Sequence, residues 1–134
     1  MLRGFAIVNL TEPNLKPAHI LVVEDNEDLR MLYQQALTIE GYNVWIASHG
    51  QEALDLLRNL STSEEFPSVI FLDLMMPVMN GWEFLEARAQ DERLAKIPVV
   101  VCSASKDNFP QGTRLLRKPV DLDMLLAIAS EYAA

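Results

Sequence analysis

The sequence predicts an α/β protein in which a doubly wound sheet of five parallel strands forms one domain. Five short apolar segments alternate with helical patterns along the 134 residues, which is typical of a parallel sheet covered on both faces. Several of these segments end in polar side chains, at the edge where such sheets present reactive groups. Half of the residues are hydrophobic, which is enough for a globular domain with a core.

The first strand is expected at residues 20–23, a run of four apolar residues that ends in the adjacent carboxylates Glu24 and Asp25. A helix follows, because Asn26 is a suitable N-cap and apolar residues then recur at helical spacing until Gly41. The side chains expected on the inward face of this helix are Leu29, Leu32, Tyr33, Ala36 and Leu37.

The second strand and the second helix are expected at residues 43–47 and 51–60, with a polar loop at residues 61–67. The third strand, residues 69–72, is apolar throughout and ends at Asp73, as a strand buried on both faces would. An unpaired carboxylate is costly to bury, so Asp73 is expected to be exposed at the carboxyl edge of the sheet.

A turn and the third helix are expected directly after this strand. Pro77 blocks helix continuation and Asn80-Gly81 is a turn dipeptide. The helix is then expected to extend from Gly81 to about residue 90, with Trp82 and Leu85 buried. A strand, an acid, an ordered turn and a helix form the arrangement in which α/β proteins present a reactive group.

The last third of the chain predicts two short strands and a final helix. Pro98 precedes the fourth strand at residues 99–102, and residues 114–117 form the fifth strand. Cys102 lies in an apolar run and is expected to be a buried core residue. The final helix is capped by Asp121 and is expected to bury Leu122, Leu125, Leu126 and Ala129.

The acidic residues after the first and third strands are expected to meet, because neighbouring parallel strands end at the same edge of the sheet. Three carboxylates, from Glu24, Asp25 and Asp73, within about 5 Å would repel by roughly 3 kcal/mol per pair at an effective dielectric constant near 20. Such a cluster needs a raised pKa or a cation, and oxygen ligands favour Mg²⁺ over zinc or copper. A magnesium site is the hypothesis; the alternative is that Asp73 caps a strand end or a helix.

Ser103 and Lys118 follow the fourth and fifth strands. A hydroxyl and an ammonium that face an acidic, metal-bearing pocket provide what an incoming phosphoryl group needs. Taken alone, Ser103 could cap a helix and Lys118 could be a solvated surface charge. Chemical complementarity at all four strand ends favours the functional interpretation.

With these residues the chain resembles the receiver domain of two-component response regulators. The resemblance spans about residues 19–132 and implies a flavodoxin-like strand order 2-1-3-4-5, with a receiver domain at residues 19–134 after an N-terminal extension at residues 1–18. The motifs that carry it are Glu24-Asp25, Asp73 within Asp-Leu-Met-Met-Pro-Val-Met-Asn-Gly, Ser103-Ala104 and Lys118-Pro119.

The resemblance implies that Asp73 takes a phosphoryl group from a phosphohistidine on a sensor histidine kinase or a histidine phosphotransfer protein. It implies no enzymatic activity beyond phosphorylation and dephosphorylation of this aspartate. It also implies that Ser103 and Lys118 contact phosphoryl oxygens and that the bond between Lys118 and Pro119 is cis. The protein ligands of Mg²⁺ that it implies are Asp25, Asp73, the backbone carbonyl of Met75, and Glu24 through water.

The chain departs from the family pattern at two places. Ser103 and Lys118 are only fifteen positions apart, too few for a typical helix of about 11 residues together with two loops and a strand. The fourth helix is therefore expected to be missing or reduced to about one turn. Leu115 stands where the family has a switch aromatic, three residues before the lysine, so an aromatic rotamer switch is not expected.

Composition limits the partners. A net charge of −8 argues against nucleic acid or an anionic membrane as the main partner. A single cysteine and the lack of a membrane-length apolar run suggest a soluble cytoplasmic protein. No output domain follows Tyr132, so a stand-alone receiver is expected to act through an unknown downstream protein, unless the chain is a piece of a longer one.

The sequence has two alternative functional interpretations. A phosphorylation-independent interaction module would keep the fold and bind a partner through residues 105–113 or the N-terminal arm. A small metal-dependent phosphatase is disfavoured, because Met75 stands two residues after Asp73, where a second aspartate would serve as general acid.

Overall fold

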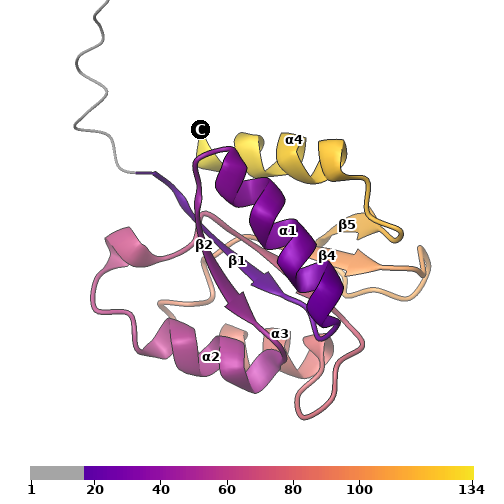
Figure 1. Ribbon diagram of the computed structural model, residues 1–134. Coiled ribbons are helices and arrows are strands. Elements are labelled where there is room, and N and C mark those ends of the chain that lie inside the picture. Colours follow the sequence, from indigo (N-terminus) through magenta and orange to yellow (C-terminus); the bar gives the residue numbers. More distant parts are fainter. Residues whose placement is uncertain (1–16) are drawn as a thin grey trace, which may run out of the picture.

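The computed structural model describes residues 17–134, so the expected N-terminal extension lies almost wholly outside the described residues. Five parallel strands form one sheet in the order β2-β1-β3-β4-β5 (Figure 1). This is the strand order that the resemblance implies. The strands are β1 (His19–Val23), β2 (Asn43–Ala47), β3 (Val69–Asp73), β4 (Val99–Ser103) and β5 (Arg114–Arg117).

Helices cover both faces of the sheet, with α1 and α4 on one face and α2 and α3 on the other (Figure 1). Their bounds are α1 (Glu27–Ile39), α2 (Gly50–Arg58), α3 (Gly81–Ala89) and α4 (Leu122–Ala133). A short 3-10 helix, η3 (Ser63–Glu65), lies in the segment that the sequence predicted as a loop. None of the helices in residues 17–134 combines the length and apolar character needed to cross a bilayer.

The central strands β1 and β3 are buried on both faces, which explains their uninterrupted apolar sequences. Because side chains alternate along a strand, Leu21 and Ile70 pack in the layer of α2 and α3, while Ile20 and Phe71 pack in the layer of α1 and α4. The core therefore has two layers, one on each face of the sheet. This packing fixes the carboxyl ends of β1 and β3 side by side.

Side-chain caps and one glycine set the ends of the helices. The Asn26 side chain accepts a hydrogen bond from the Leu29 amide at 2.9 Å and begins α1, as predicted. Asn80 and Glu83 form a capping box at the start of α3, and Asp121 caps α4. Gly41 follows the end of α1 with a φ of 99°, a conformation that favours glycine.

Two predictions of burial were wrong. Leu32 and Trp82 are 42% and 40% exposed. In α1 the buried stripe is centred on Tyr33, and Leu32 lies about 100° around the helix from it. In α3 the residue that faces the core is Phe84, which lies on the side of the helix opposite Trp82.

Between Ser103 and Arg114 the chain forms turns and bends, and no helix occurs in this segment. This agrees with the expectation that the fourth helix is missing or reduced. Short side-chain hydrogen bonds order the segment instead; for example, the Thr113 hydroxyl donates to the Pro110 carbonyl at 2.6 Å. Phe109 packs against the core layer of α2 and α3, where the half-buried Leu115 also packs.

Candidate functional site

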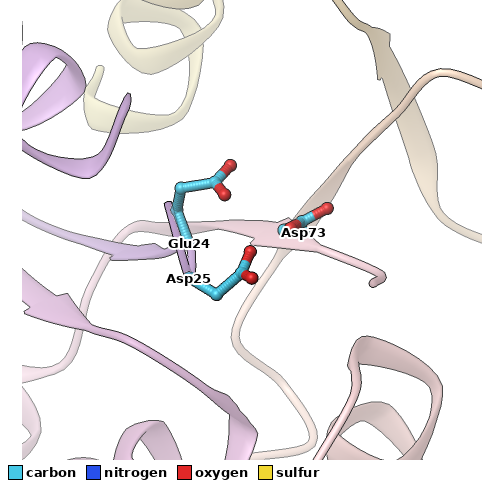
Figure 2. A group of neighbouring side chains, drawn as sticks. All are labelled: Glu24, Asp25 and Asp73. Atoms are coloured by element: carbon cyan, nitrogen blue, oxygen red, sulfur yellow. The ribbon is translucent and has the colours of Figure 1, made fainter. Parts of the chain in front are cut away.

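Three carboxylates gather at the carboxyl edge of the sheet. Glu24 and Asp25 directly follow β1, and Asp73 is the last residue of β3, the neighbouring strand. Each residue offers one carboxylate oxygen to a group whose atoms all lie within 4.8 Å of one another. Figure 2 shows the three side chains at the ends of these strands, with the Asp25 carboxylate turned toward Asp73.

Asp73 is only 5% exposed, so the expectation of an exposed carboxylate was wrong. The cost of burial is offset in part by Lys118, whose Nζ lies 3.3 Å from Asp73 Oδ1. The same ammonium lies 3.0 Å from Oε1 of Glu24, which is 2% exposed. The Lys118 ammonium, directly after β5, thus forms ion pairs with two buried carboxylates at the ends of β1 and β3.

The negative charge of the cluster exceeds what Lys118 neutralises. Burial above all, together with the neighbouring charge of Glu24 and a hydrogen bond with Asp25, raises the pKa of Asp73 to about 6, although Lys118 acts to lower it. Burial lowers the pKa of Lys118, but its hydrogen bond to Glu24 and the attraction of both carboxylates outweigh burial and raise it. The lysine therefore stays charged at neutral pH, beside an acidic group with an unusually high proton affinity.

Ser103 and Met75 lie beside this cluster. Cys102 of β4 pairs with Asp73 of β3, so Ser103 follows one position beyond, at the same edge of the sheet. The Ser103 carbonyl accepts a hydrogen bond from the Lys118 amide at 2.9 Å, and its hydroxyl oxygen accepts one from the Ser105 amide at 3.2 Å. The Met75 amide lies 3.4 Å from Asp73 Oδ1, and the Met75 side chain is 79% exposed.

The structure therefore brings all six expected residues to one edge of the sheet, and the peptide bond between Lys118 and Pro119 is cis. Arg30 also contacts this edge, and no sequence motif pointed to it. Its Nη1 donates to the Glu24 backbone carbonyl at 2.8 Å. The available signal was a basic residue one turn after Asn26, the N-cap of the helix that follows Glu24 and Asp25. The spacing did not show that the side chain of this residue turns back onto the end of the strand.

The donor set of the cluster suits a hard divalent cation. Carboxylate oxygens are the ligands that Mg²⁺ prefers, and neither sulfur nor imidazole belongs to the group. A cation would also offset the repulsion from Glu24 that, after burial, raises the pKa of Asp73. The residues present therefore fit Mg²⁺.

A parallel sheet of this order, with its polar groups at the carboxyl ends of the strands, defines a flavodoxin-like protein with a site at the switch point of the sheet. The chain belongs to the response regulator receiver domain family, whose model matches residues 20–129.

Solved structures show the same architecture. The chemotaxis response regulator CheY4 of Vibrio cholerae superposes with a TM-score of 0.76 and 26% sequence identity, covering 87% of this chain and 99% of that chain. The receiver domain of the hybrid histidine kinase CckA superposes with a TM-score of 0.71 and 28% identity, covering 87% of this chain and 100% of that one.

Curated relatives differ in length. The probable transcriptional regulator ycf29 of Pyropia yezoensis is 35% identical over 122 residues, which cover 86% of this chain and 53% of that protein. The polar-differentiation response regulator DivK of Brucella anthropi is 28% identical over 123 residues, covering 87% of this chain and 96% of DivK. The chain thus spans about half of ycf29 and nearly all of DivK.

Proposed function

We propose that this receiver is phosphorylated on Asp73 in a two-component phosphorelay and that the modification switches a protein-interaction surface. The observation that carries the proposal is the position of Asp73, in a group of three carboxylates within 4.8 Å and 3.3 Å from the Lys118 ammonium. The donor would be a phosphohistidine on a sensor histidine kinase or a histidine phosphotransfer protein. A segment of the sensor histidine kinase TmoS of Ectopseudomonas mendocina, 35% identical over 88 residues, supports a link to such systems.

The transfer is a displacement at phosphorus. An ionised Asp73 oxygen attacks the phosphorus, the P–N bond breaks, and its electron pair stays on the imidazole nitrogen of the donor, which takes a proton from water. The product is an acyl phosphate on Asp73. With a pKa of about 6, Asp73 is mostly ionised at neutral pH and available for this attack.

The metal ligands in this proposal are Asp25, Asp73, the Met75 backbone carbonyl, and Glu24 through water. Mg²⁺, when bound, offsets the repulsion between the attacking carboxylate and the phosphoryl group. Lys118, already charged and next to Asp73, pairs with a phosphoryl oxygen and absorbs further negative charge.

Ser103 supplies the switch. Its hydroxyl donates a hydrogen bond to a phosphoryl oxygen, and this change repositions the segment after β4, which is tied to Ser103 through the Ser105 amide. Residues 104–113 contain no helix and Leu115 is not aromatic. The altered surface is therefore the segment itself, and the downstream partner is a protein that reads its position.

In this proposal, residues 19–134 form the receiver domain and residues 1–18 form an extension to it. The single cysteine, Cys102, is buried and unpaired, which suits a reducing cytoplasm. The net charge of −8 makes nucleic acid and anionic membranes poor partners.

Intact-mass spectrometry tests the proposal. Incubation with Mg²⁺ and a small phosphodonor such as acetyl phosphate is expected to add one phosphoryl group to the wild type and none to Asp73→Asn. Asp55→Asn is the matched control, because Asp55 is exposed on α2, and this variant is expected to be phosphorylated like the wild type. If the wild type gains no phosphoryl group, the proposal is wrong and a phosphorylation-independent interaction module, binding through residues 105–113, becomes the better explanation.

A further inference from the structure

Arg30 contacts the backbone of the loop that carries two of the three carboxylates. It lies in the first turns of α1, where its amide donates to the Asn26 carbonyl at 2.9 Å. Its side-chain Nη1 donates to the Glu24 carbonyl at 2.8 Å and lies 3.4 Å from the Asp25 carbonyl. The guanidinium therefore folds back along the helix and binds the main chain at the end of β1.

The contact leaves the carboxylates of the cluster available. Glu24 receives hydrogen bonds at its carboxylate from the Asn26 amide at 3.1 Å and from Lys118 at 3.0 Å. Arg30 binds the carbonyl of the same residue, and within residues 17–134 it forms no ion pair with any carboxylate. A guanidinium that binds these backbone carbonyls fixes the loop and leaves the carboxylate oxygens free for a metal ion.

The charge of Arg30 also acts on the neighbouring loop. Its positive charge contributes to lowering the pKa of Glu52, in the first turn of α2, although hydrogen bonds from Ser48 are the main cause. Glu52 in turn accepts a hydrogen bond from the Ser48 hydroxyl at 2.8 Å, just after β2. The charge of Arg30 thus acts on the loops that follow both β1 and β2.

We infer that Arg30 is a positioning residue for the metal pocket: by binding the carbonyls of Glu24 and Asp25, it holds this loop so that both carboxylates face Asp73. Like charges within 4.8 Å repel, so a loop without this tie relaxes to separate them. The inference rests on the proposed function, because it concerns the Mg²⁺ that phosphorylation of Asp73 would need. Groups that orient metal ligands typically change metal affinity about 10–100-fold.

The sign of the effect distinguishes positioning from simple electrostatics. A positive charge near a cation site repels the cation, so if Arg30 acted only through its charge, removing the charge would tighten Mg²⁺ binding. If Arg30 positions the loop, removing the guanidinium weakens Mg²⁺ binding despite the lost repulsion. The two roles predict opposite changes in the dissociation constant.

The test is a titration of the protein with Mg²⁺ alone, by calorimetry. Arg30→Met, which keeps an unbranched apolar stem, is expected to raise the Kd about 10-fold. Arg30→Lys keeps the charge but lacks the planar fork, and it is expected to recover only part of this loss. Arg58→Met is the matched control, because it removes the same charge from an exposed position at the end of α2 and is expected to leave the Kd unchanged.

Amide hydrogen exchange without metal supplies a second readout. Arg30→Met is expected to speed exchange in residues 24–29 and to leave the amides of β3 and β4 unchanged. If the wild type binds Mg²⁺ and Arg30→Met binds it equally or more tightly, with unchanged exchange in the loop, the inference is wrong and the proposed function stands. If the wild type does not bind Mg²⁺, the proposed function fails and the role of Arg30 fails with it.

Discussion

At the scale of single residues, the site contains fewer positive charges than carboxylates. Lys118 is shared between Glu24 and Asp73, and Arg30 binds carbonyl oxygens instead of side chains. The cluster therefore carries more negative than positive charge, and burial together with the charge of Glu24 raises the pKa of Asp73. Carboxylate oxygens in such a cluster suit a divalent cation.

The raised pKa of Asp73 predicts how this residue affects the stability of the fold. Its pKa in the folded protein, about 6, exceeds the ordinary value of 3.8, so the fold favours the protonated form. Its contribution to stability is fully present below about pH 4 and is lost as the pH rises through 6. Without divalent ions, Asp73→Asn is therefore expected to raise the free energy of unfolding at pH 7 by about 1–3 kcal/mol.

Urea unfolding at pH 7 and pH 4 in the presence of a chelator measures this effect. The advantage of Asp73→Asn is expected to shrink at pH 4, where the wild-type carboxyl is largely protonated. Asp55→Asn is the control and is expected to stay within about 0.5 kcal/mol of the wild type. A destabilised Asp73→Asn at pH 7 would contradict the charge balance described for the site.

At the scale of elements, the site depends on the close approach of α3 to the end of β3. Gly81, the first residue of α3, donates its amide to the Leu74 carbonyl at 2.9 Å. A Cβ at this position would lie 2.6 Å from the Asp73 carbonyl oxygen and 2.8 Å from the Leu74 Cα. Both are backbone atoms, so the contact cannot be relieved by moving a side chain.

Gly81→Ala is therefore expected to push α3 away from β3 and to destabilise the fold by about 1–3 kcal/mol, the usual range for overpacking. Because the clash falls on the Asp73 carbonyl, the rate of phosphorylation by a small phosphodonor is also expected to fall. Chemical unfolding and intact-mass kinetics measure the two effects. Glu86→Ala, exposed on the same helix, is the control, and a Gly81→Ala variant as stable as this control would contradict the close approach.

The segment between β4 and β5 shows what chain length alone can decide. Too few residues separate Ser103 from Lys118 for a helix, and the structure agrees. The sequence did not reveal how this segment would pack against the rest of the protein. Phe109 packs against the core there, and this contact depends on the position of a loop that no periodic pattern describes.

At the scale of the whole molecule, the position of the carboxylates predicts that folding and Mg²⁺ binding are coupled. The three carboxylates come from segments that are far apart in the sequence and meet only in the folded sheet. Mg²⁺ is therefore expected to bind the folded protein and not the unfolded chain. At a free concentration ten times its Kd, it should raise the free energy of unfolding by about 1.4 kcal/mol.

Urea unfolding with and without Mg²⁺, at matched ionic strength, measures this coupling. The stabilisation is expected in the wild type and in Asp55→Asn, and it is expected to be lost in Asp73→Asn. Equal stabilisation of all three proteins would show that Mg²⁺ acts elsewhere on this acidic chain, and the metal site at the sheet edge would be wrong.

The sequence by itself determined the alternation of strands and helices, the polar residues at the strand ends, and the lack of room for a helix after Ser103. These features depend on residue order, periodicity and chain length, which are local properties. Tertiary structure decided that Asp73 is buried, that Lys118 serves two anions, and that Arg30 binds the end of β1. Burial and the distance between charges depend on segments that are remote in the chain, so only their packing could set them.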